Sequence, residues 1–92
     1  MWYNMYYEKV ALLSKSFYTD KIHDEIEDIV KQMYQNEEDA KHITRTIKSS
    51  PYLSTETIDI MNNYRQKLLD KNKALLKRFR ILEKDLKDIQ NR

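Results

Sequence analysis

The stretch STETIDIMNNYRQKLLDKNKALLKRFRILEKDLKDIQ, residues 54–90, decides the fold. It contains neither glycine nor proline, and apolar residues recur along it at alternating intervals of three and four. This spacing is the heptad of a coiled coil, in which positions a and d form one stripe along a helix. Ser54 is suited to cap the first turn, and Leu53 and Ile58 are placed as an apolar staple around that cap. The stretch is therefore predicted to form one long helix.

The heptad begins with Ile58 at position a and predicts a helix–helix interface. Its residues are Ile58, Met61, Leu68, Asn72, Leu75, Phe79, Leu82, Leu86 and Ile89. Asn72 at an a position resembles the buried asparagine that fixes register in two-stranded coiled coils. A helix of roughly 50 Å is long for so short a chain and needs a partner along its length. We therefore expect a homodimer through this stripe.

Two other uses of the same stripe stay open. Leu69 and Leu76 at e positions make the apolar face wider than a two-stranded interface, and Arg65 at an a position suits a dry dimer poorly. These features favour packing of the long helix on the chain's own first helices. The third alternative is contact with a different protein.

The first half of the chain, residues 1–53, is predicted to form three short helices. The first covers about Trp2–Phe17, the second follows a cap at Thr19 or Asp20, and the third follows a cap at Asn36 and ends before Pro51. The predicted fold is all-α. A single domain, residues 1–92, contains three short helices (1–53) and one long C-terminal helix (54–92) in a helical bundle or coiled coil.

The composition argues against most enzymatic and cofactor-binding sites. The chain has no glycine, which phosphate-binding loops require, and no cysteine for disulfides or thiolate metal sites. Asp20 and His23, like Asp39 and His42, form a carboxylate–histidine pair at a spacing that metal-binding bundles use. Acidic residues at predicted helix starts are explained by capping alone. We expect no catalytic residues, no metal and no cofactor, and therefore no enzyme.

Charge is distributed unevenly along the chain. Residues 1–53 hold seven Lys and Arg against nine Asp and Glu, a net charge of −2, whereas residues 54–92 hold ten against six, a net charge of +4. A basic patch within the long helix contains Arg65, Lys67, Lys71, Lys73, Lys77, Arg78 and Arg80. It is suited to nucleic-acid phosphates, to an acidic protein surface or to the chain's own acidic half. Its basic residues interleave with the leucines, unlike a basic region that precedes a zipper.

The N-terminus is rich in aromatic residues, and Trp2, Tyr3, Tyr6 and Tyr7 are suited to a membrane interface or to anchoring a protein interface or core. The segment lacks a basic face for anionic lipid, so the protein anchors are predicted and no membrane partner is expected. No apolar run is long enough to cross a bilayer and no signal peptide is recognisable, so a soluble, cytoplasmic protein is expected. The abundance of Lys, Asn, Ile and Tyr suggests an AT-rich genome such as that of a phage or low-GC bacterium. The predicted function is a small protein–protein interaction module, namely an adaptor, regulator, inhibitor or assembly component, whose predicted partner is a second copy or another protein. The alternative is a nucleic-acid-binding regulator.

Overall fold

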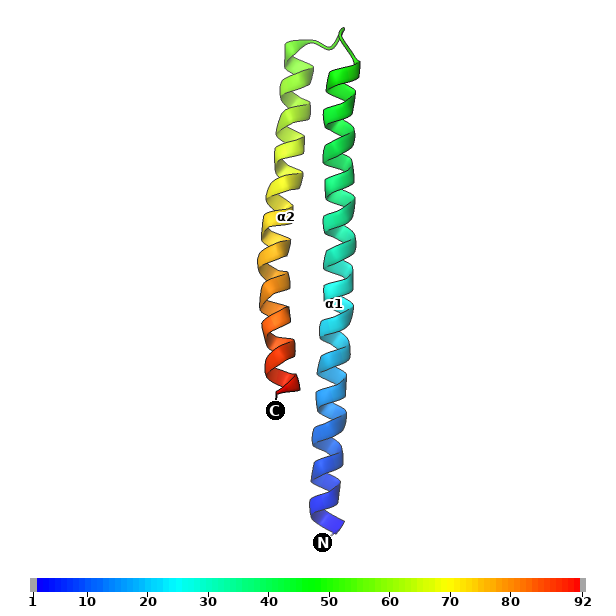
Figure 1. Ribbon diagram of the computed structural model, residues 1–92, viewed down its shortest axis with the longest axis vertical. Helices are drawn as coiled ribbons and strands as arrows, with labels where there is room; N and C mark the ends of the chain where they lie inside the picture. The colour runs from blue at the N-terminus through cyan, green and yellow to red at the C-terminus, as the bar shows by residue number, and fades with distance from the viewer. Residues whose placement is uncertain (1, 92) are drawn as a thin grey trace.

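The computed structural model is a hairpin of two long helices (Figure 1). It describes the backbone of residues 2–91 and the side chains of residues 17–91. Helix α1 covers Trp2–Ser49 and helix α2 covers Thr55–Gln90. The helices run antiparallel, and the molecule measures 79 × 16 × 15 Å. The prediction of an all-α fold is confirmed.

The prediction of three short helices before residue 54 is wrong, because α1 runs unbroken from Trp2 to Ser49. Neither glycine nor proline occurs before Pro51, so nothing in the backbone forces a break. Thr19, Asp20 and Asn36 were expected to be caps, but such residues cost only up to about 0.7 kcal/mol inside a helix. Packing against α2 outweighs that cost.

The turn ends α1 and sets the start of α2. Pro51 cannot continue the hydrogen-bond pattern of α1, and the Leu53 amide donates to the Ser50 carbonyl at 3.4 Å. Ser54 is the N-cap of α2, and its hydroxyl accepts a hydrogen bond from the Thr57 amide at 3.2 Å. This cap satisfies a backbone donor that the first helical turn leaves unpaired.

The interior between the helices is thin. Among residues 17–91, five hydrophobic side chains are buried: Ile29, Ala40, Ile43, Leu68 and Leu82. Ala40, Ile43 and Leu68 form the central cluster, against which Ile47 and Met61 also pack. A two-helix hairpin offers each helix only one neighbour, so most side chains keep one side in water.

The two helices differ in length, and α1 extends beyond the free end of α2 (Figure 1). The hydrogen bond between the side chains of Asn36 and Asn72 sets the register of the hairpin. From that level, the last helical residue of α2, Gln90, lies opposite about Tyr18. Residues 2–16 therefore have no α2 beside them.

Candidate interaction surface

The predicted heptad of α2 lies against α1 of the same chain. Every predicted interface residue is buried or half-buried there, from Ile58 to Ile89. Leu68 and Leu82 are each only 3% exposed. The matching stripe on α1 has the same alternating spacing: Ile22, Ile26, Ile29, Met33, Asn36, Ala40, Ile43 and Ile47. We call these two stripes together the seam. In this conformation a second copy has no access to it.

A polar layer crosses the middle of the seam. The Asn36 amide nitrogen donates to Asn72 Oδ1 at 3.0 Å, and Asn72 Nδ2 donates to the Met33 carbonyl at 3.0 Å. These groups are partly buried, where an unpaired amide is costly. The layer therefore favours the register in which the two asparagines meet.

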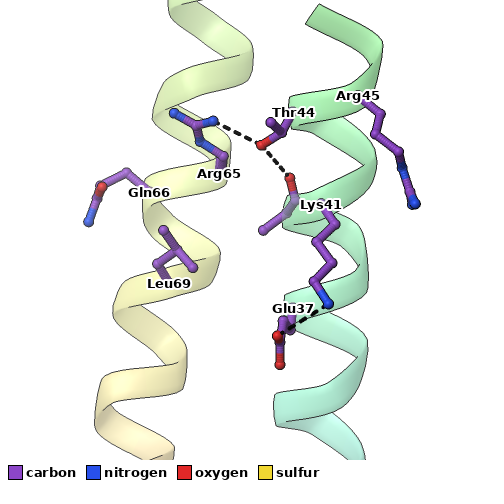
Figure 2. A pocket seen from close by; sticks show the side chains of 8 residues that line it. Glu37, Lys41, Thr44, Arg45, Arg65, Gln66 and Leu69 are labelled. Carbon is purple, nitrogen blue, oxygen red and sulfur yellow. Dashed lines mark hydrogen bonds and ion pairs between the residues drawn. The ribbon is translucent and has the colours of Figure 1, made fainter. Parts of the chain in front are cut away.

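Arg65 forms a second polar crossing nearer the turn (Figure 2). Its guanidinium donates to Thr44 Oγ1 at 2.9 Å, and the Thr44 hydroxyl donates to the Ala40 carbonyl at 3.1 Å. The aliphatic part of an arginine can cover apolar surface while its charged head reaches a polar partner. Arg65 can therefore occupy an a position of the seam.

The basic patch is partly used within the chain. Arg78 pairs with Glu25 of α1 through two hydrogen bonds, of 2.9 and 3.3 Å. The Glu25 carboxylate accepts these hydrogen bonds and also carries the opposite charge. Both effects raise the pKa of the Arg78 guanidinium. The remaining members are exposed around the outer surface of α2: Lys67, Lys71, Lys73, Lys77 and Arg80.

Beside the seam, large apolar side chains stay exposed along one edge of the hairpin. Val30 and Tyr34 of α1 are 50% and 65% exposed, and Leu69 and Leu76 of α2 are 39% and 36% exposed. We call these four residues the apolar flank. They line two shallow hollows between the helices that share Glu37 as a common wall residue. The hollow near Leu69 is shown in Figure 2.

The apolar flank differs from the other exposed apolar positions of α2. Ile60 and Ile81 are at outward c positions, and Tyr64 is at a g position on the opposite edge of the seam. That opposite edge also carries the Glu25–Arg78 pair, which is the only interhelical ion pair among residues 17–91. Of the two edges of the seam, the one that carries the apolar flank is therefore the less covered by contacts within the chain.

Other predicted site residues lie elsewhere. Trp2, Tyr3, Tyr6 and Tyr7 belong to the part of α1 that extends past α2, and their side chains lie outside the described residues. His23 and His42 are exposed on α1. Within residues 17–91, no group of three or more His, Asp or Glu side chains is placed to hold a metal ion. Neither helix, over its described length, has an apolar stretch that would cross a membrane.

The comparisons give no relative from which to transfer a function. No family model, curated protein or solved structure matches this chain.

Two features of this surface depend on the fold more than on local sequence patterns. The apolar residues of the α1 stripe are recognisable in the sequence as two pieces, Ile22 to Met33 and Ala40 to Ile47, but the interpretation of Asn36 as a helix cap separates them. The apolar flank was indicated only by Leu69 and Leu76 at e positions. Its α1 half, Val30 and Tyr34, depends on which edge of α1 lies beside those leucines.

Proposed function

We propose that this chain is a non-enzymatic protein–protein interaction module that acts through helix–helix contacts. The observation that carries the proposal is the apolar flank, in which Val30, Tyr34, Leu69 and Leu76 line the groove that the two adjoining hollows form between the helices, while each stays at least one-third exposed. Adjacent exposed apolar side chains with polar residues around them are typical of interaction sites.

The thin interior of the hairpin supports the same conclusion. A small domain buries a low fraction of its surface, and each square ångström of apolar surface removed from water contributes about 25 cal/mol. A helix lying in the groove would cover the exposed faces of the apolar flank together with the half-buried Met33 and Phe79, which line the same hollow. Binding therefore extends an interior that the chain alone leaves incomplete.

Site-specific photo-crosslinking in the source cells tests this proposal. A photoreactive phenylalanine analogue replaces Tyr34 in one variant and Tyr52 in a matched control. Tyr52, in the turn, is 98% exposed, so it is more accessible than Tyr34 at 65%. We expect a discrete polypeptide adduct from position 34 and none from position 52. No adduct at position 34, or equal adducts at both positions, would contradict an interaction at the apolar flank.

Nucleic-acid binding through the basic patch is the second candidate. Six of its seven side chains are exposed, and within residues 17–91 only Arg78 of the patch forms an ion pair. The five exposed residues other than Arg78 occupy several helical positions around α2, so they do not form one line that follows a phosphate backbone. We therefore rank this function below protein binding.

A further inference from the structure

Two rows of residues at seven-residue intervals, most of them charged, run along the outer sides of the apolar flank. The α1 row consists of Asp20, Glu27, Tyr34, Lys41 and Lys48. The α2 row consists of Lys87, Arg80, Lys73, Gln66 and Asp59. All ten residues are exposed. Each row changes sign along its length, from acidic to basic on α1 and from basic to acidic on α2 in the order given.

The two rows are matched in height along the hairpin. The Asn36–Asn72 hydrogen bond places these two residues at one level. We count residues from that level along the two antiparallel helices. The heights of Glu27 and Arg80 along the hairpin axis then differ by about one residue, a rise of roughly 1.5 Å. The same count brings Asp20 to Lys87 and Lys48 to Asp59. Within one chain these rows lie on the outer sides of the groove, so the opposite charges are level with each other without meeting.

We infer that the occupant of the apolar flank is a second copy of this chain, related by a two-fold axis parallel to the hairpin; this inference rests on the proposed function. Such an axis lays α1 of each copy over α2 of the other at equal heights. Val30 and Tyr34 then cover Leu76 of the second copy. Glu27 meets Arg80 of the second copy, and the symmetry repeats every pair.

The centre of the two rows favours this arrangement over the alternative symmetric one, because the outer charges find opposite partners in both. If the axis crossed the hairpin instead, Glu27 would meet Lys41 of the second copy. At the centre, however, α2 would lie antiparallel on α2 of the second copy, and Lys73 would meet its own counterpart. Like charges brought together are unfavourable. With the parallel axis, Lys73 faces the ring of Tyr34 of the second copy, a favourable cation–π contact.

The extension of α1 gives an independent reason for the parallel axis. Residues 2–16 lie past the end of α2 and have no helix beside them in the hairpin (Figure 1). An isolated helix of that length is marginal in water. The parallel axis brings both extensions out at the same end, at diagonal corners of the four-helix arrangement, so the extension of the second copy is the helix available to each of them there. The crossed axis sends them to opposite ends.

Disulfide trapping with purified protein tests the inference. The chain has no cysteine of its own, so only the introduced cysteines can form disulfides. Three mixtures are prepared, each with Glu27→Cys as one component. The second component is Arg80→Cys, Lys41→Cys or the outward-facing control Lys84→Cys, and it carries a tag that gives it a different mass. Each mixture is oxidised mildly, and the mixed dimers are quantified. We expect the Glu27→Cys and Arg80→Cys pair to dominate. Dominance of the pair with Lys41→Cys, which the crossed axis would bring to Glu27, would overturn the orientation.

Light scattering on the wild-type protein and on variants with exchanged charges at positions 27 and 80 completes the test. Wild-type protein should change from monomer to dimer with rising concentration. Glu27→Arg or Arg80→Glu alone should raise the dimer Kd by about 2- to 30-fold, as expected for exposed pairs that occur twice, and the double exchange should restore it. A monomer at all concentrations would overturn the second copy as occupant. It would leave the interaction module standing if position 34 still crosslinks to another polypeptide.

Discussion

At the scale of single residues, the Asn36–Asn72 pair sets the alignment of the two helices. Apolar contacts along a heptad can slide by one repeat with little loss, whereas an amide that leaves its partner loses hydrogen bonds in a partly buried site. The pair here joins two segments of one chain. Its effect is therefore on how the hairpin closes.

We predict energetic coupling between the two asparagines. Asn36→Leu or Asn72→Leu alone leaves the remaining amide facing an apolar side chain, whereas the double substitution removes both polar groups. The free energy of unfolding of the double variant should exceed the additive expectation from the single variants by about 0.5–1.5 kcal/mol. Urea unfolding of the four proteins measures this difference. Additive effects would mean that the hydrogen bond contributes nothing to the register.

At the scale of the helices, the continuity of α1 separates this fold from the bundle predicted from sequence. A helix that began after a cap at Asn36 would have Glu37 as its first residue, where proline is tolerated. In the continuous helix, proline at position 37 removes the bond to the Met33 carbonyl and its ring clashes there.

Glu37→Pro should therefore cost about 3 kcal/mol or more of unfolding free energy. The matched control is Thr55→Pro, because Thr55 is the first residue of α2 after the Ser54 cap. There we expect little change. Thermal and urea unfolding followed by circular dichroism compare the two variants. Tolerance of both substitutions would contradict a continuous α1.

The sequence predicted α2 well and α1 poorly for physical reasons. The Ser54 cap, the single proline and the alternating spacing all agree over residues 54–90, and α2 begins at Thr55 and ends at Gln90 as predicted. In α1 the cap-forming residues suggested breaks that the tertiary contacts override. Asn36 looks the same in sequence as a cap and as a buried pairing residue. Its role depends on Asn72, which is distant in the chain.

At the scale of the whole molecule, the hairpin lays an acidic half of the chain beside a basic half. The Glu25–Arg78 ion pair is one direct contact between them. The other exposed basic residues of the patch lie on the outside of α2, where they are accessible to another molecule. The net charge of the whole chain is only +2.

This arrangement predicts weak nucleic-acid binding. Phosphate contacts lose affinity steeply as salt rises, and the neighbouring acidic helix opposes the approach of a polyanion. Mobility shifts with duplex and single-stranded DNA and RNA should show no sub-micromolar binding at about 150 mM salt. Lys71→Glu with Lys77→Glu, away from the apolar flank, serves as the comparison. Sub-micromolar binding that this double variant abolishes would favour the nucleic-acid function instead.

The hairpin register also has a kinetic consequence. Three polar contacts cross between the helices, and their sequence separations increase with distance from the turn. Arg65 and Thr44, nearest the turn, are separated by 21 positions, Asn36 and Asn72 by 36, and Arg78 and Glu25, nearest the chain ends, by 53. Closing a loop costs more entropy as the loop lengthens, so the first crossing is the least costly to form from the open chain. Once formed, it shortens the loop that the next crossing must close. The lowest-entropy route to the native hairpin therefore zips from Pro51 toward the termini.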